Sequence, residues 1–223
     1  MNTTIRVRNN EYAKTLIVIA LIVGIVLGFF FGLQLILNNP VPVRVVESGS
    51  MCIPYGRLCN GWLSLNHPFA RTLHKGDLII IQGVDPKDLN TNYPNSDIII
   101  YENPTDPTST PIVHRIVTSY EVNGTLYFQT KGDGNDDKYP QMPPVREYDS
   151  NTIWTTGEGV PQDLVAGRVV MRIPYFGWIT LLLKDNPWGL PLIIAVILLL
   201  VVLEFIIPII KGKKSKTERL LIV

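Results

Sequence analysis

The feature that most constrains this chain is a long apolar segment near the N-terminus. No charged residue occurs in 15–43, and 16–37 is almost wholly apolar. As an α-helix those residues would reach about 33 Å, which is enough to cross the hydrocarbon core of a bilayer. A signal peptide, the alternative, has a shorter apolar core of about 7–15 residues followed by a small-residue cleavage site. We therefore expect a short N-terminal segment, 1–14, and a retained transmembrane helix, 15–37.

A second apolar run covers residues 190–210, and Glu204 is its one charged residue. A buried core helix is the alternative, but the length of the run and the basic residues behind it favour a membrane span. We expect a transmembrane helix over 189–210 and a basic tail over 211–223. Glu204 is expected near the interface or against a partner helix rather than in a functional site.

Basic residues gather at the outer ends of both apolar runs. Arg6, Arg8 and Lys14 precede the first run, and four lysines and one arginine follow the second. Positive charge beside a span marks the cytoplasmic side, so both termini are predicted to be cytoplasmic. The segment 38–188 is then extracytoplasmic, and the chain is predicted to be a two-pass protein of the cell membrane.

The extracytoplasmic segment is mildly acidic and contains both cysteines. It holds 12 of the 20 Lys and Arg and 16 of the 19 Asp and Glu, a net charge near −4. Nucleic-acid binding normally needs a basic patch, so we expect no such partner. Outside the cell a local disulfide between Cys52 and Cys59 is plausible, and a free pair is the alternative. The three histidines of the chain do not suggest a metal site with these cysteines.

Short Ile- and Val-rich runs separated by turn residues predict a mainly β domain of sandwich or barrel type. The pair Asn123-Gly124 between two such runs is the strongest hairpin signal in the chain. Asn123-Gly124-Thr125 is also a glycosylation sequon, and we favour the hairpin as the reason for these residues. The expected fold is thus an extracytoplasmic β domain anchored by two transmembrane helices. The expected strands cover 43–48, 77–82, 97–101, 113–122, 125–130 and 165–173.

Ser50 is the strongest candidate for a nucleophile. It lies in Ser48-Gly49-Ser50-Met51, a turn-like stretch directly after the strand that follows the first span. A serine hydroxyl is a weak nucleophile unless a base lies within hydrogen-bond reach. The candidates are His67, His74 and His114. His114 stands out because it interrupts the apolar strand Ile112–Val117, although a lone histidine is more often a satisfied core or surface residue.

Hairpin geometry suggests which acid could orient His114. If Val122 pairs with Thr125 and the ladder has no bulge, His114 lies opposite Asp133. Cross-strand neighbours lie about 5 Å apart, within reach of a carboxylate–imidazole hydrogen bond. Alternatives for the acid-rich stretch 131–138 are a solvated turn or a calcium loop, but its spacing does not match an EF-hand.

Five stretches of this chain resemble the five conserved motifs, or boxes, of the type I signal peptidases of the archaeal and endoplasmic-reticulum subgroup, and they occur in the family's order. Box three of that subgroup has histidine where bacterial relatives have lysine, as His114 is here. Two departures occur: the proline after Met51 comes one residue later than usual, at Pro54, and the acidic box is shorter. The stretches are 48–51, 75–79, 112–116, 130–137 and 167–177.

The resemblance implies a membrane-bound serine endopeptidase that cleaves signal peptides from exported preproteins after small residues, without a cofactor. Ser50 would be the nucleophile, His114 the base, and the Ser48 hydroxyl an oxyanion donor. Family alignment favours Asp137 as the acid that orients His114, hairpin arithmetic favours Asp133, and Asp136 stays open. The implied partners are preproteins, the lipid bilayer and the secretion translocon.

Two other functions are compatible with the sequence. One is a non-catalytic cell-surface module for binding or assembly, for which replacing Ser50 or His114 would leave function intact. The other is a peptidase of the same fold that acts on another membrane-protein target. Substrate profiling separates the latter from a signal peptidase.

Overall fold

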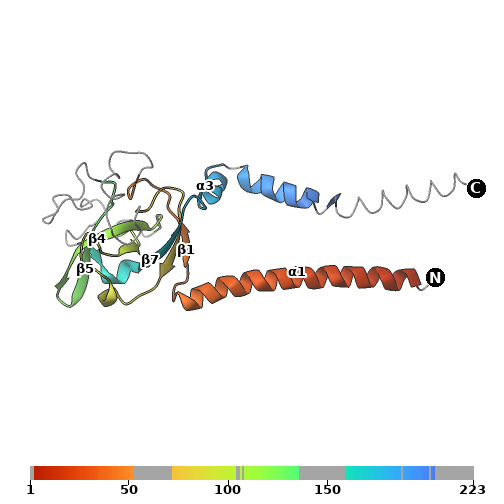
Figure 1. Cartoon of the computed structure of the whole chain (residues 1–223), viewed down its shortest axis with the longest axis horizontal. Coiled ribbons are helices and arrows are strands. Elements are labelled where there is room, and N and C mark those ends of the chain that lie inside the picture. The colour runs from red at the N-terminus through yellow and green to blue at the C-terminus, as the bar shows by residue number, and fades with distance from the viewer. Residues whose placement is uncertain are drawn as a thin grey trace, which may run out of the picture. The chain divides into compact units, whose positions relative to one another are not determined.

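The computed structural model describes residues 3–52, 72–103, 106, 108–135, 159–186, 188–200 and 202–203. The chain divides into two units, Met1–Gly177 and Trp178–Val223. The first unit holds one long helix and the β domain (Figure 1). The second holds the helical segments near the C-terminus.

The β domain is built on a seven-stranded antiparallel sheet with the order β1-β2-β7-β3-β4-β5-β6. The predicted mainly β fold is therefore confirmed. Two short 3₁₀ helices, η2 (Pro86–Asp88) and η3 (Gln162–Leu164), lie in the connections. The strands are β1 (Val43–Val45), β2 (Leu78–Gln82), β3 (Ile98–Tyr101), β4 (Ile112–Val122), β5 (Thr125–Lys131), β6 (Val160–Pro161) and β7 (Val165–Ile173).

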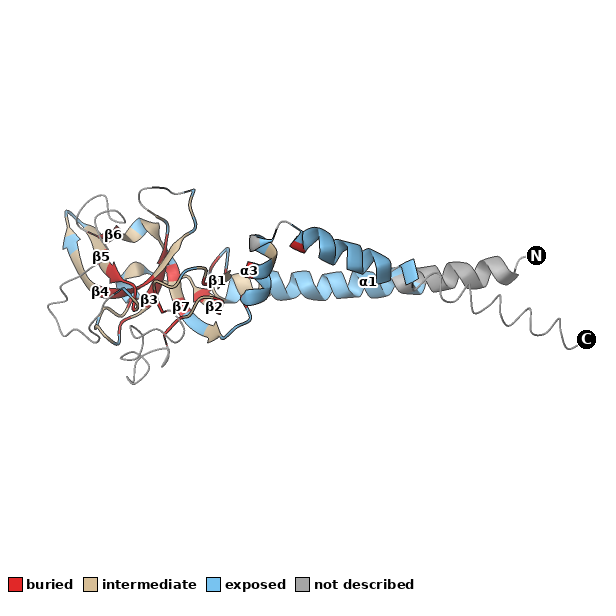
Figure 2. Cartoon of the chain, turned by 90° about the horizontal axis from the view of Figure 1, so that it is seen from above, coloured by how far each residue is buried: buried red, intermediate tan, exposed pale blue. Residues whose placement is uncertain are grey.

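The core lies on both faces of the sheet. Strand β3 is buried along its whole length, and its side chains alternate between two apolar clusters, because successive residues of a strand face opposite sides. Ile98 and Ile100 belong to the cluster that contains Val46 and Met51. Ile99 and Tyr101 belong to the cluster that contains Phe128 and Val160. Figure 2 shows this buried interior within the β domain.

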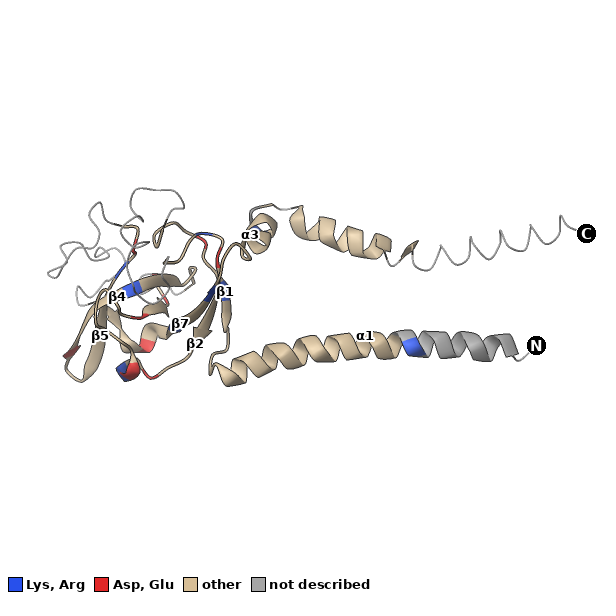
Figure 3. Ribbon diagram, viewed as in Figure 1, with Lys and Arg blue, Asp and Glu red and all other residues tan. Residues whose placement is uncertain are grey.

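Helix α1 (Thr3–Ile36) covers the predicted N-terminal span, 15–37, except its last residue, and begins within the segment 1–14. Its segment Leu16–Ile36 reaches a mean hydropathy of 3.0, long and apolar enough to cross a membrane. No charged residue occurs in 15–36, so most of the described part of α1 is tan in Figure 3, and its apolar side chains are exposed. Its end is tied to the β domain, because Gly83 N donates to Leu37 O at 2.8 Å and Asn39 Nδ2 donates to Ala166 O at 2.9 Å.

The second predicted span is only partly within the described residues. Helix α3 (Trp178–Asp185) precedes a further helical segment, Gly189–Leu200, and the two helices are bent by 105°. Among the residues that the structure describes, α1 alone passes as a span, unless this bent pair is taken as one. The expected helix over 189–210 with Glu204, and the tail over 211–223, therefore stay predictions.

The β4–β5 hairpin turns at Asn123-Gly124 as predicted, and both residues have positive φ, +51° and +83°. The predicted register holds only for the outer half of the hairpin. Thr118 pairs with Gln129 but Ile116 pairs with Thr130, so a bulge shifts the inner half by one residue. Arg115 pairs with Lys131, which places His114 opposite Gly132. The expectation that His114 lies opposite Asp133 is therefore wrong, because a bulge adds one residue to β4.

Candidate active site

Ser50 lies in a loop whose two ends are held in the β domain. Before it, Val46 is buried, donates from its N to Asp77 O at 2.9 Å and accepts from Gly76 N at 2.8 Å. After it, Met51 and Cys52 are buried. Between these anchors, Ser48 and Ser50 line an open cavity.

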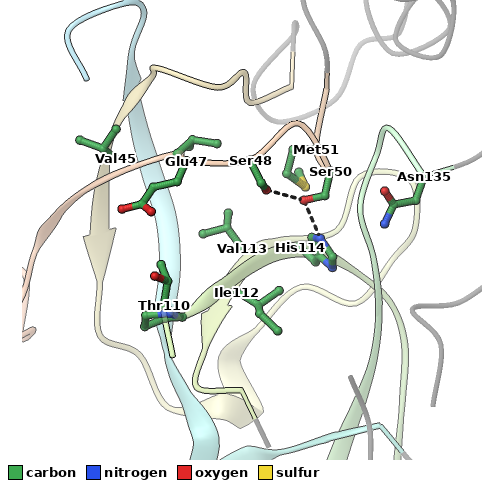
Figure 4. A pocket seen from close by; sticks show the side chains of 12 residues that line it. Val45, Glu47, Ser48, Ser50, Met51, Thr110, Ile112, Val113, His114 and Asn135 are labelled. Atoms are coloured by element: carbon green, nitrogen blue, oxygen red, sulfur yellow. Dashed lines mark hydrogen bonds between the residues drawn. The ribbon is translucent and has the colours of Figure 1, made fainter. Parts of the chain in front are cut away.

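The structure brings Ser50 and His114 together from positions 64 residues apart. His114 lies on β4, where it pairs with Ile99 of the buried strand β3, and it is 3% exposed. Its Nε2 lies 2.9 Å from Ser50 Oγ. Figure 4 shows Ser50 Oγ joined to His114 on one side and to Ser48 on the other. A hydroxyl within hydrogen-bond reach of an imidazole nitrogen is the arrangement that nucleophilic acyl transfer requires.

Ser48 places a second hydroxyl beside the candidate nucleophile. Ser48 Oγ lies 3.1 Å from Ser50 Oγ. A group so close to the attacking oxygen can also reach the oxygen of a carbonyl that Ser50 attacks. The position is therefore compatible with the role expected for Ser48 as an oxyanion donor.

The turn after β5 packs directly on the Ser50 loop. Gly134 N donates a hydrogen bond of 2.9 Å to Ser50 O. A Cβ atom on Gly132 would lie 2.4 Å from Ser50 O and 3.0 Å from His114 Nε2. This close approach explains why glycine is needed at position 132.

Asp133 does not hydrogen-bond His114. Its Oδ1 accepts from Arg115 Nε at 2.9 Å, its Oδ2 accepts from Arg115 Nη2 at 3.0 Å, and Thr72 Oγ1 also donates to Oδ2. The carboxylate is thus engaged in a bidentate ion pair inside the domain. The other two candidate acids, Asp136 and Asp137, lie outside the described residues.

Arg115 is a site residue that the sequence analysis did not single out. It is fully buried, and besides its pair with Asp133 it donates from Nη1 to Ser96 O at 2.9 Å. A second buried pair joins Arg172 Nε to Asp77 Oδ2 at 2.7 Å. The clue was an arginine next to His114 in an otherwise apolar strand, because a charge is buried only with a partner.

A cavity of about 420 Å³ is lined by Ser50, His114 and Asn135, among other residues. One wall is the chain from Val45 to Met51, and the other is Thr110 to His114 at the start of β4. The backbone N–H and C=O groups of Val46 point toward the segment 76–77, to which they are hydrogen-bonded. Because these groups alternate along an extended chain, those of Val45 and Glu47 point the other way, away from that segment. An extended peptide can pair with such strand edges. The lining of this cavity, called the groove below, is therefore compatible with the binding of an extended peptide.

The remaining candidates lie away from this pair or outside the described residues. His74 lies near Asp77, with its Nδ1 3.7 Å from Asp77 Oδ2. Cys52 is disulfide-bonded, and Cys59, its expected partner, is outside the described residues together with His67. Within the described ranges, no group of three or more His, Cys, Asp or Glu side chains could hold a metal ion.

The paired hydroxyl and imidazole in the lining of this groove define a site suited to hydrolysis by acyl transfer. No protein-family model matches the chain. Its relatives include the signal peptidase complex catalytic subunit SEC11 of Verticillium alfalfae, 28% identical over 198 residues, covering 87% of this chain and 94% of the relative. The proteins of that name from Fusarium vanettenii (28%; 87% and 94%) and Tuber melanosporum (27%; 83% and 86%) are also similar. They confirm the resemblance to the endoplasmic-reticulum subgroup of type I signal peptidases.

Proposed function

We propose that this chain is a membrane-anchored serine endopeptidase that removes signal peptides from exported preproteins. The observation that carries the proposal is the 2.9 Å contact between Ser50 Oγ and His114 Nε2 in the lining of the groove. The relatives named as signal peptidase catalytic subunits support the substrate class. They also make the non-catalytic surface module the less favoured reading.

In the proposed mechanism, Ser50 Oγ attacks the scissile carbonyl while His114 Nε2 accepts its proton. The tetrahedral intermediate collapses to an acyl ester on Ser50, and His114 donates the proton to the leaving amine. Water then attacks the ester, again assisted by His114, and releases the signal peptide. We propose Asp137 as the acid that holds the imidazole in the correct tautomer. The commitment of Asp133 to Arg115 supports this choice.

The oxyanion of the intermediate would be bound by the backbone N–H of Ser50 and by the Ser48 hydroxyl. The distance of 3.1 Å between the two serine hydroxyls supports this assignment. Loss of one donor of this kind costs about 10²–10³-fold in rate. Ser48→Ala should therefore slow turnover by that factor without abolishing it.

The groove and the anchor favour a substrate that comes from the membrane. Val45, Val46, Ile112 and Val113 offer apolar walls for small side chains next to the cut. Because α1 can place the domain at the bilayer, enzyme and substrate would share one plane, which raises the effective concentration of scissile bonds. We propose a two-pass anchor in the cell membrane, with both termini cytoplasmic and the β domain outside.

The relatives are named as subunits of a complex, so we also propose that this chain has partner subunits. The secretion translocon is a second proposed partner, because it delivers preproteins to the same membrane. Neither partner is needed for the chemistry proposed for Ser50 and His114.

The test is cleavage of a preprotein by the purified full-length protein in detergent. Ser50→Ala should lower kcat by about 10⁴-fold or more, because it removes the nucleophile itself. Ser119→Ala is the matched control, since Ser119 lies on the outer half of β4 opposite Phe128 and away from the groove. Equal cleavage by Ser50→Ala and the wild type would refute the proposed function.

A further inference from the structure

Thr72 adopts a backbone conformation that is unusual for its residue type. Its φ is +49°, in the left-handed region, and its side chain is fully buried. A β-branched residue is a true outlier there, because its Cβ crowds the backbone. Such a conformation persists only where the surroundings hold it, and it often marks a functional site. The contacts of Thr72 show what holds it.

Thr72 links two buried ion pairs. Its Oγ1 donates to Asp133, the partner of Arg115. Its carbonyl oxygen accepts from Nη1 of Arg172, the partner of Asp77. Arg115 is fully buried, Asp77 and Asp133 are nearly so, and Arg172 is only slightly exposed. In its left-handed conformation one residue thus bonds to a carboxylate on one side and a guanidinium on the other.

Asp133 connects Thr72 to the candidate catalytic pair. Its neighbour Gly134 donates to Ser50 O, and its other neighbour, Gly132, leaves no room for a Cβ against Ser50 O and His114 Nε2. A shift of Asp133 would therefore move a turn that touches both Ser50 and His114. A misplacement of about 1 Å in reacting groups can cost about 10²-fold in rate.

We propose that Thr72 is a positioning residue that fixes Asp133, and through the 132–135 turn holds Ser50 and His114 in reactive geometry. The inference rests on the proposed peptidase function. It assigns Thr72 no contact with substrate. It gives the hydroxyl, rather than the bulk of the side chain, the decisive role.

Three variants of the full-length protein separate the hydroxyl from its alternatives. Thr72→Val keeps the β-branch and removes the hydroxyl, so it should lower kcat by about 10–100-fold with KM within about 3-fold of the wild type. Thr72→Ser keeps the hydroxyl and should stay within about 3-fold of the wild-type kcat. Tyr101→Phe is the control, because it removes another buried hydroxyl, 3.1 Å from Thr130 Oγ1, from the strand β3.

Amide hydrogen exchange gives a readout that does not need activity. Thr72→Val should speed amide exchange in the 132–135 turn, where Gly134 N–H is hydrogen-bonded to Ser50 O. The strands of the sheet should exchange as in the wild type. Tyr101→Phe should lower thermal stability without this local change and without the loss of kcat. Equal kcat for Thr72→Val and the wild type, or equal losses in Thr72→Val and Thr72→Ser, would overturn the proposal.

The two proposals can fail separately. If the wild type cleaves no preprotein, the proposed function fails, and hydrogen exchange still decides whether Thr72 controls the turn. If the wild type cleaves but Thr72→Val exchanges and cleaves like it, only the role of Thr72 fails.

Discussion

Replacing Gly132 with alanine applies the smallest possible perturbation at the centre of the candidate site. The added Cβ would lie 2.4 Å from Ser50 O, 2.8 Å from Asn135 Nδ2 and 3.0 Å from His114 Nε2. The nearest of these atoms belongs to the backbone, so it cannot move aside as a flexible side chain would. Ordinary contact begins at 3.4 Å, so the turn and the Ser50 loop would have to separate by about 1 Å.

A displacement of about 1 Å between reacting groups costs about 10²-fold in rate, equivalent to about 2.7 kcal/mol in the activation free energy. We therefore expect Gly132→Ala to lower kcat by about 10²-fold, with a smaller change in KM because the apolar groove walls stay intact. Gly134→Ala should be milder. Its Cβ would meet Ser50 O at 3.0 Å and Gly49 O at 3.1 Å, so a few tenths of an ångström relieve the contact.

The assay is single-turnover cleavage of a preprotein in detergent, with thermal unfolding measured on the same samples. Gly124→Ala is the control, because nothing lies within 4 Å of its Cβ and the residue lies at the tip of the hairpin. Its φ of +83° makes alanine cost about 1 kcal/mol in stability, with kcat unchanged. A Gly132→Ala protein with wild-type kcat, or one less impaired than Gly134→Ala, would refute the reasoning.

Three further predictions concern the Arg115–Asp133 pair, the acid proposed to orient His114, and the C-terminal end of α1. Arg115→Met should lower the free energy of unfolding by about 3–5 kcal/mol, because it leaves the buried Asp133 carboxylate without its partner, and adding Asp133→Leu should restore much of that loss. Thermal unfolding in detergent measures both variants. No recovery in the double variant would show that the buried charge is not the cause. In the preprotein cleavage assay, Asp137→Asn should lower kcat by about 10³–10⁴-fold and Asp136→Asn by less than about 3-fold. The reverse order would mean that Asp136, rather than Asp137, orients His114. Asn39→Ala should lower the free energy of unfolding by about 1–3 kcal/mol, because the Asn39 side chain donates to Ala166 O and accepts from Val41 N. An unchanged melting temperature would show that these hydrogen bonds do not hold the end of α1.

Local chemistry made much of the fold predictable. The uncharged length of α1 predicted a helix that can span a membrane, and Asn123-Gly124 predicted the hairpin turn because both positions need positive φ. The strand β7 has the bounds that were predicted, Val165–Ile173. These features depend on residues close together in the sequence, so no tertiary information was needed to find them.

The features that sequence reasoning missed depend on tertiary fit. No residue in β4 indicates the bulge at Val117, so a regular hairpin register was assumed, which put Asp133 opposite His114. In the structure Asp133 instead forms an ion pair with Arg115. The left-handed Thr72 is equally hidden, because its residue type disfavours that conformation and its described partners, Asp133 and Arg172, lie far away in the sequence. Ser50 and His114 were candidates from their residue types and positions, and the resemblance to type I signal peptidases favoured His114 over the other histidines. Their contact across 64 residues came only with the structure.

The central claim is that Ser50 is the nucleophile, and the most direct measurement is to trap the covalent intermediate. Full-length protein mixed with a preprotein would be quenched in acid within one turnover, digested and analysed by mass spectrometry. We predict an acyl group of signal-peptide mass on the peptide that contains Ser50, and no such adduct on Ser50→Ala. An acyl group on another residue, or wild-type turnover by Ser50→Ala, would contradict the claim.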